Sequence, residues 1–437
     1  MRWFAPYAWL PGGLAQDVLL VTEGEVFWSV APGGDPSGAT WLPGIVLPGF
    51  ANCHSHAFHR ALRGRTHDRG GTFWTWRERM YTVASQLDPS KYRALARAVY
   101  AEMALAGVTS VGEFHYLHHD VGGRLFADPN AMGDALRAAA VEAGIRLTLL
   151  DTCYLSGGLN AGGHLPLNET QRRFGDADVS AWADRVAQLT ESPGMRIGAA
   201  LHSVRAVPAS AFPEIVRVAG GRPLHAHLSE QPAENEACAA FYGCTPTELL
   251  AQHGALGAAT TAVHATHLTA RDVSLLGGAG STACFCPTTE RDLADGIGPS
   301  SALAAAGVRL SLGSDQHAVV DLIEDARALE MDERLATRRR GNFRPDELLA
   351  ALTAHDSIGW PETGRLAAGA RADLVAVRLD SVRTAGIDPG QVLLAATAAD
   401  VDTVIVDGRT IVSGGRHRLG DVGASLRASI EPLWTRR

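Results

Sequence analysis

The sequence contains almost no lysine. Lys91 is the only one among 437 residues, and arginine supplies nearly all of the positive charge. The formal net charge is −8 and no block of basic residues occurs, so we do not expect nucleic-acid binding. The chain also lacks a long apolar run and a signal-peptide core, so we expect no membrane span.

Cysteine is scarce and scattered. The six cysteines stand at positions 53, 153, 238, 244, 284 and 286, and none forms a CxxC pair. Several of them lie inside apolar runs that are predicted to be strands. This usage favours reduced core thiols over disulfide bonds. We therefore expect a soluble, cytoplasmic protein.

Apolar runs alternate with segments of helical periodicity over most of the chain. Eight such runs, each followed by a helical segment, predict an α/β protein with a (β/α)8 TIM barrel. The predicted strands are 45–53, 108–113, 145–154, 195–204, 223–230, 261–268, 281–287 and 308–315. The predicted helices include 88–107, 130–143, 178–191, 208–219, 245–253, 269–276, 300–306, 319–338 and 345–354.

The two ends of the chain have another pattern, with short β-like pieces between Gly and Pro turns. We expect residues 1–44 and 360–437 to pair into a small β-sandwich domain beside a catalytic barrel at 45–359. A polar and aromatic insertion, about residues 57–80, follows the first predicted strand. It contains Phe73-Trp-Thr-Trp-Arg77, and a loop of this length on a barrel is more often functional than structural.

Histidines and one aspartate stand at the predicted carboxyl ends of barrel strands, where such barrels carry reactive groups. His54 and His56 follow the first strand, and residues i and i+2 of a strand point to the same face. His227 and Asp315 stand at the ends of the fifth and eighth strands. A lone His-x-His is usually an ordinary core or surface pair. Together, however, three imidazoles and a carboxylate predict a divalent metal site.

This arrangement resembles the amidohydrolase superfamily, in which histidines of strands one, five and six and an aspartate of strand eight surround one or two metals. The resemblance covers nearly the whole chain. It implies a ligand set and a catalytic set: His54, His56, His227 and Asp315 as ligands, with Glu230, His264 and Asp315 as catalytic groups. The spacing His227-x-x-Glu230 resembles the deaminase branch.

One metal is expected rather than two. Binuclear members of the superfamily commonly bridge their metals with a carboxylated lysine on the fourth strand, and Lys91 lies in a predicted helix well before that strand. The ligand set accepts Zn²⁺ or Fe²⁺, and we expect zinc.

Hydrolysis of a C–N bond at an amidine-like or ring carbon is the expected chemistry. A divalent metal can lower the pKa of a bound water from about 16 to about 7. Asp315 can accept a proton from that water, and His264 can polarise it. Glu230 can carry a proton to the leaving nitrogen, because neighbours can move the pKa of a carboxylate toward neutrality.

Motifs around the predicted barrel mouth indicate the substrate class. HSHAFxR, FWTWR, EFHYxHHD, HSxRAV, VHATH and CPTTExxLxDGI resemble superfamily members that hydrolyse a formimino group on a small dicarboxylate. The resemblance implies substrate contacts with His59, Arg77, Tyr116, His202 and Arg205 and suggests a homodimer. Guanidinium groups suit carboxylates, which they bind through two parallel hydrogen bonds. Each arginine could instead be an ordinary surface residue. His59 departs from the motif, since glutamine is expected there.

Two other interpretations stay open. A deaminase of the same superfamily could act on guanine, an adenosine derivative or a triazine, with Phe73, Trp74 and Trp76 as a stacking surface. The chain could also be a metal-binding scaffold without catalysis, although the presence of both Glu230 and His264 argues against it.

Overall fold

The computed structural model describes residues 1–67 and 73–434, without the side chains of Phe73 and Trp74. The stacking surface that those two aromatic residues could form therefore lies outside the described residues. No described helix is long and apolar enough to cross a membrane. All six cysteines are free thiols, and all but the partly exposed Cys244 are buried.

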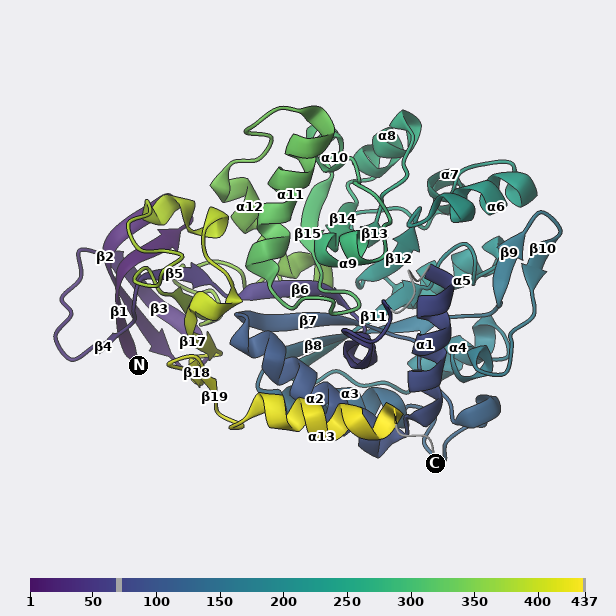
Figure 1. Ribbon diagram of the computed structural model, residues 1–437, viewed down its shortest axis with the longest axis horizontal. Coiled ribbons are helices and arrows are strands. Elements are labelled where there is room, and N and C mark those ends of the chain that lie inside the picture. Colours follow the sequence, from purple (N-terminus) through teal and green to yellow (C-terminus); the bar gives the residue numbers. More distant parts are fainter. Residues whose placement is uncertain (68–72, 435–437) are drawn as a thin grey trace.

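Eight parallel strands form the barrel, as the sequence predicts (Figure 1). They are β6 (Phe50–Ser55), β7 (Val108–His115), β8 (Arg146–Cys153), β11 (Met195–Leu201), β12 (Leu224–Leu228), β13 (Thr260–His264), β14 (Thr282–Phe285) and β15 (Arg309–Leu312). Most are buried along their whole length, as expected for a parallel sheet that is covered by helices. At the carboxyl ends of β6 and β15, the amide of His56 donates to the carbonyl of Asp315 at 3.1 Å, and the amide of Asp315 donates to the carbonyl of His54 at 3.0 Å.

Helices cover the outside of the barrel (Figure 1). They are α2 (Pro89–Leu105), α3 (Ala131–Ala143), α4 (Val179–Val186), α5 (Phe212–Ala219), α6 (Pro232–Tyr242), α7 (Pro246–Gln252), α8 (Ala270–Gly278), α9 (Pro287–Asp292), α10 (Ser300–Ala305), α11 (Leu322–Thr337) and α12 (Pro345–Leu352). The start of α2 shows why they begin where they do. Asp88 accepts a hydrogen bond from the amide of Lys91 at 2.9 Å, and Pro89 occupies the first helical position.

The insertion after the first barrel strand is more ordered than a loop. It contains the 3₁₀ helix η1 (Ala57–Leu62) and the helix α1 (Phe73–Gln86). Trp76, Met80 and Val83 recur at helical spacing in α1 and are buried against the core. The helix forms because this apolar stripe has a barrel surface to cover.

The two ends of the chain are hydrogen-bonded into one nine-stranded sheet at one end of the molecule (Figure 1). Its strands are β1 (Arg2–Leu10), β2 (Gly13–Glu23), β3 (Val26–Pro32), β4 (Thr40–Trp41), β5 (Ile45–Pro48), β16 (Leu374–Val377), β17 (Val401–Val406), β18 (Arg409–Ser413) and β19 (Arg416–His417). A separate apolar cluster that includes Trp3, Phe27 and Leu366 forms its core.

The predicted first strand, 45–53, is two strands. β5 belongs to the terminal sheet, where it pairs with β1 and β16, and β6 begins the barrel. Gly49 joins them. The residue is glycine because a Cβ at that position would lie 2.4 Å from Oγ1 of Thr109. At the other end, helix α13 (Val422–Trp434) leaves the sheet and lies along α2 (Figure 1). The domain limits of 1–44 plus 360–437 and 45–359 stay a prediction.

Candidate active site

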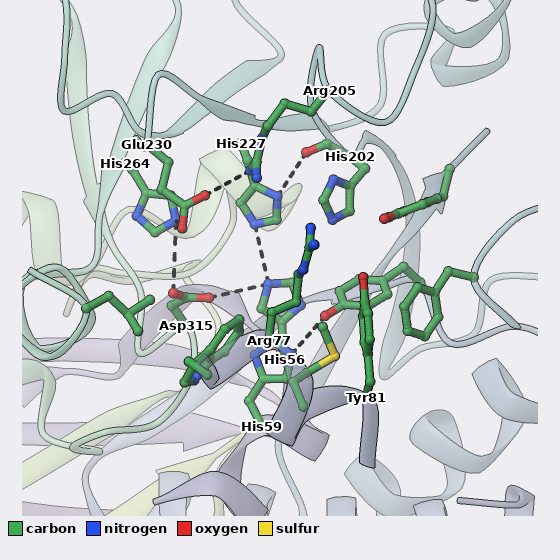
Figure 2. Close-up of a pocket in the computed structure, with 16 residues that line it drawn as sticks. His56, His59, Arg77, Tyr81, His202, Arg205, His227, Glu230, His264 and Asp315 are labelled. Carbon is green, nitrogen blue, oxygen red and sulfur yellow. Dashed lines mark hydrogen bonds and ion pairs between the residues drawn. The ribbon is translucent and has the colours of Figure 1, made fainter. Parts of the chain in front are cut away.

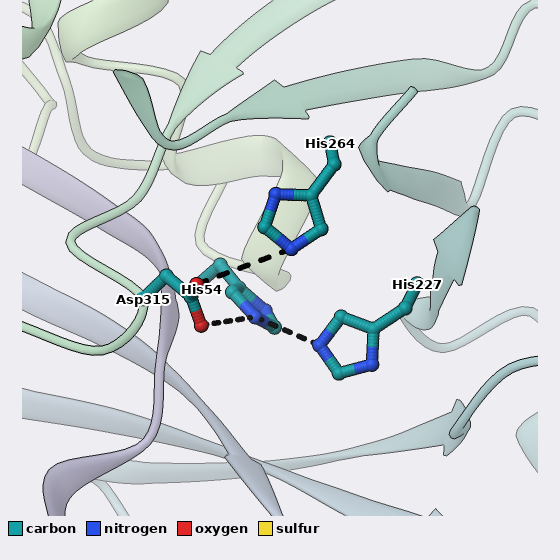
Figure 3. A group of neighbouring side chains, drawn as sticks. All are labelled: His54, His227, His264 and Asp315. Carbon is teal, nitrogen blue, oxygen red and sulfur yellow. Dashed lines mark hydrogen bonds and ion pairs between the residues drawn. The ribbon is translucent and has the colours of Figure 1, made fainter. Parts of the chain in front are cut away.

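The four predicted metal ligands meet at the carboxyl ends of β6, β12 and β15. Figure 2 labels His56, His227 and Asp315, and Figure 3 shows His54 with His227 and Asp315. Nε2 of His54 and Nε2 of His56 each lie 3.3 Å from Oδ1 of Asp315. Nε2 of His227 lies 3.2 Å from Nε2 of His54 and 3.4 Å from Nε2 of His56. Four ligand atoms about 2.1 Å from one ion at tetrahedral angles are about 3.4 Å apart. These four separations are therefore compatible with a metal ion among these atoms, and ligand-type atoms of His54, His227, His264 and Asp315 all lie within 4.8 Å of one another.

The hydrogen positions on these rings give a second test of the fit. Nδ1 of His56 lies 2.9 Å from the carbonyl oxygen of Phe114, and Nδ1 of His227 lies 2.9 Å from the carbonyl oxygen of His202. A carbonyl can only accept, so each Nδ1 carries the hydrogen and each neutral ring keeps a lone pair on Nε2. Two such lone pairs that face each other repel unless a cation lies between them. This donor arrangement is the usual one around a divalent metal.

Burial keeps the ligand rings neutral. It lowers the pKa of His54 to about 3, and it lowers the pKa values of His56 and His227 as well. A neutral imidazole can donate its lone pair to a metal, whereas an imidazolium cannot.

The backbone turns sharply where strands end at the site. Ser229 has φ 51°, His264 has φ 68° and Asp315 has φ 40°, all in the left-handed region that non-glycine residues seldom adopt. Such outliers persist where the surrounding structure holds them in place, and they are common in active sites. Gly313 is required nearby, because a Cβ there would lie 2.7 Å from Cβ of His54.

His264 lies beside the ligand group among three carboxylates. Its Nε2 is 4.0 Å from Oδ2 of Asp315 and 3.9 Å from Oε1 of Glu230. Its Nδ1 is 3.4 Å from Oε1 of Glu290, which also accepts a hydrogen bond from the amide of Cys286 at 2.8 Å. Burial lowers the pKa of His264, but the carboxylates outweigh burial and leave that pKa well above its usual value. His264 can therefore carry a proton beside the reacting group.

The five predicted substrate contacts all line one pocket of about 80 Å³ in front of the ligand group (Figure 2). They are His59, Arg77, Tyr116, His202 and Arg205. Trp76, Met80, Tyr81, Tyr154, Phe174 and Leu293 complete the wall. Arg77 extends from α1 into the pocket (Figure 2). Nη2 of Arg205 donates to Oε2 of Glu230 at 3.0 Å, so neither arginine is an ordinary surface residue.

His59, the departure from the motif, is 2% exposed, and its Nε2 lies 2.8 Å from Oη of Tyr116. The sequence places it at the pocket, and the structure pairs it with another predicted contact. Glu290 was missed as a neighbour of His264. Its signal is its place in CPTTE, directly after the strand β14.

The single lysine lies away from this site. Lys91 is half exposed on α2 and forms an ion pair of 3.0 Å with Asp88. The fourth barrel strand, β11, carries neither lysine nor a carboxylate. No bridging carboxylated lysine is therefore present, which supports one metal rather than two.

This chain belongs to the amidohydrolase family, which it matches over residues 45–411. The family consists of hydrolases that use a divalent metal ion, and deaminases are among the relatives of this chain. A formimidoylglutamate deiminase of Pseudomonas aeruginosa is 37% identical, with 95% of each chain covered. An 8-oxoguanine deaminase of the same species is 31% identical over 87% of this chain and 85% of its own.

Solved structures give the same architecture. An amidohydrolase from Brucella melitensis matches with a TM-score of 0.91 at 33% identity, over 99% of this chain and 100% of that chain. An atrazine chlorohydrolase of Arthrobacter aurescens, solved in complex with zinc, has a TM-score of 0.85 at 22% identity, over 99% of this chain and 100% of its own. At that identity the likeness concerns the fold alone. The predicted superfamily and barrel are confirmed.

Proposed function

We propose that this protein hydrolyses N-formimino-L-glutamate to N-formyl-L-glutamate and ammonia, a step of histidine degradation. The observation that carries the proposal is the pair of arginines, Arg77 and Arg205, in a small pocket that opens onto the metal-ligand group. A dicarboxylate offers two anions to these two guanidinium groups. Tyr116 and His202 add polar contacts on the same wall. The similarity to the formimidoylglutamate deiminase of P. aeruginosa supports the same substrate.

The chemistry then falls to groups that already face one another. A divalent metal held by His54, His56, His227 and Asp315 would supply Lewis acidity and lower the pKa of a water at the site. Asp315 accepts a proton from the attacking water, whose oxygen adds to the formimino carbon. His264 steadies the charge that develops there. The added hydroxyl then gives up the second proton of the water as the formyl C=O forms. Glu230 carries this proton and the one first accepted by Asp315 to the terminal nitrogen, the bond from carbon to that nitrogen breaks, and ammonia leaves.

We propose zinc as the metal. Three imidazoles and one carboxylate suit Zn²⁺, which can add a water as a further ligand, and Fe²⁺ accepts the same ligands. Elemental analysis of protein purified without added metal, followed by reconstitution with each ion, distinguishes the two. We also propose a cytoplasmic location and a homodimer. Light scattering of the purified protein tests the homodimer.

A purine or triazine deaminase is the second candidate, because aromatic residues line the pocket. Trp76, Tyr154 and Phe174 could stack on a planar ring. Steady-state ammonia release separates the candidates when formiminoglutamate, guanine, 8-oxoguanine, 5-methylthioadenosine and a triazine are compared on one metal-analysed sample. Turnover of a ring substrate with none of formiminoglutamate would overturn the first proposal. Full activity in a Glu230→Ala variant that keeps its metal would overturn the proton-transfer scheme.

A further inference from the structure

Glu234 is a buried carboxylate that the reaction scheme leaves unused. It is the third residue of α6, and its side chain is fully buried. Oε1 of Glu234 accepts a hydrogen bond from the amide of Ser229 at 3.1 Å, and Oε2 lies 3.1 Å from Nε of Arg205. Glu234 thus ties the turn after His227 to an arginine that follows another barrel strand.

Arg205 lies between two carboxylates that differ in their surroundings. Glu230 lines the catalytic pocket, receives Nη2 of Arg205 at 3.0 Å and lies near His264 (Figure 2). Glu234 does not line that pocket. It borders an adjoining cavity of about 280 Å³, and the backbone of Ser229 holds it in place.

The single positive charge of Arg205 already faces two carboxyl groups. A third carboxylate, from a substrate, therefore binds Arg205 well only if one of the two gives up its contact. Glu230 is the one placed to do so, because it faces the pocket where the substrate enters. Glu234 borders only the adjoining cavity, its side chain is fully buried, and the amide of Ser229 gives it a backbone partner of its own.

We propose that Glu234 is a positioning residue that holds Arg205 in place while Glu230 yields its contact to a carboxylate of the substrate. This inference rests on the proposed function, since it takes the substrate to be a dicarboxylate. It has a mechanistic consequence. Carboxylate binding frees Glu230 for proton transfer, so recognition of the distal group and readiness of the proton carrier become one event.

The test is the Glu234→Gln variant. Glutamine can still accept the hydrogen bond from Ser229 through its oxygen, but its NH₂ group then faces Nε of Arg205, donor against donor. We expect KM for formiminoglutamate and the Kd of N-formyl-L-glutamate, measured by calorimetry, to rise about tenfold. We expect kcat to stay within about twofold of wild type, and metal content to be unchanged.

Glu236→Gln is the matched control, because Glu236 stands on the same helix but is exposed. It removes the same charge and should leave KM and Kd unaltered. Glu234→Asp keeps the charge and shortens the side chain, and it should give an intermediate rise. Circular dichroism establishes that each variant is folded. Wild-type affinity in the folded Glu234→Asp and Glu234→Gln proteins, or an increase in affinity, overturns the proposal.

A double-mutant cycle tests whether Glu234 acts through Arg205. In an Arg205→Ala background, Glu234→Gln should add no further loss, and an additive loss overturns the proposal. Turnover and binding separate the two inferences. Turnover with no effect of Glu234→Gln on binding leaves only the proposed function standing. A carboxylate affinity that depends on Glu234 without turnover leaves only the positioning role. If the protein shows neither turnover nor carboxylate binding, both inferences are overturned.

Discussion

Two buried groups of histidines and carboxylates lie in this barrel, and they differ in what supplies the positive charge. The first is the metal-ligand group of His54, His56, His227 and Asp315. The second, here called the Arg185 cluster, consists of His115, His118, His119, Asp151, Asp176 and Arg185. In it, Nη1 of Arg185 lies 2.7 Å from Oδ2 of Asp151, and Nη2 lies 2.9 Å from Oδ2 of Asp176.

Ligand-type atoms of His115, His118 and Asp151 also lie close together. Yet Nε2 of His118 donates to the carbonyl of Thr152 at 2.9 Å, so the nitrogen nearest Asp151 carries a hydrogen. The guanidinium of Arg185 already neutralises the carboxylate. In the metal-ligand group the lone pairs converge and histidine rings surround Asp315. The direction of lone pairs and the presence of a built-in cation, more than composition, distinguish a metal site from a structural ion pair.

The largest expected effect breaks this comparison at the metal. Replacing His227 with Ala should remove the bound metal and lower kcat/KM at least about 10⁴-fold, or about 5 kcal/mol. Replacing His118 with Ala should leave one metal per chain. Elemental analysis and ammonia release on the same samples measure both. Loss of the metal from the His118→Ala protein would contradict the assignment.

Arg185 provides the next test, on stability. Arg185→Met should leave Asp151 and Asp176 buried without a counter-ion and lower the free energy of unfolding by about 3–5 kcal/mol. Arg137→Met is the control, because Arg137 forms an exposed ion pair with Asp134, and it should stay within about 0.5 kcal/mol. Urea denaturation measures both. The folded Arg185→Met protein should keep its metal, and an undiminished stability would refute the structural role.

Arg205 also bridges two carboxylates, but it faces the pocket. Arg205→Ala should therefore lower kcat/KM by a factor that corresponds to roughly 2–5 kcal/mol of lost carboxylate binding. The effect should concern catalysis more than folding, in contrast to Arg185. Steady-state kinetics and the urea midpoint of one preparation give the two values. Unaltered kinetics in a folded variant with reduced expression would make Arg205 a structural residue.

The smallest effect is a pH dependence of stability. Burial, with the charge of Arg185, lowers the pKa of His118 from 6.5 to about 4. The unfolded ring binds a proton near pH 6.5 and the folded ring only near pH 4, so the stabilisation is complete above pH 6.5. It is lost as the pH falls toward 4, by about 3 kcal/mol in total. In a His118→Gln protein the free energy of unfolding should fall less steeply with decreasing pH over this window. The difference in slope corresponds to at most one fewer proton bound on unfolding. Equal slopes for the two proteins would show that His118 titrates normally.

Sequence patterns predicted the barrel and the ligand group for one physical reason. Buried parallel strands are near-continuous apolar runs, and the ligands follow them directly. The same rule failed at 45–53, where β5 and β6 are both buried and the apolar run continues across two different sheets. Apolar periodicity alone cannot show that a run changes partners at Gly49.

Positions set by tertiary contacts were beyond the sequence. Glu234 stands in a stretch of small and polar residues that was not predicted to be a helix, and its spacing is that of an ordinary surface charge. Only the packing of α6 against the turn at Ser229 makes it a buried partner of Arg205. The same holds for Glu290, which acquires its place beside His264 once β13 and β14 are adjacent.

The two backbone hydrogen bonds between β6 and β15 have a consequence for how the barrel holds together. They connect the first and last strands of the barrel at the ligands themselves. The neighbouring hydrogen-bonded pair, Asn52 and Ser314, is 262 residues apart in sequence. A metal shared by His54, His56 and Asp315 would therefore hold the ends of β6 and β15 together. Because closing so long a loop costs entropy, removal of the metal by a chelator should weaken the contact between β6 and β15 first. Hydrogen exchange would then start at the amides of His56 and Asp315.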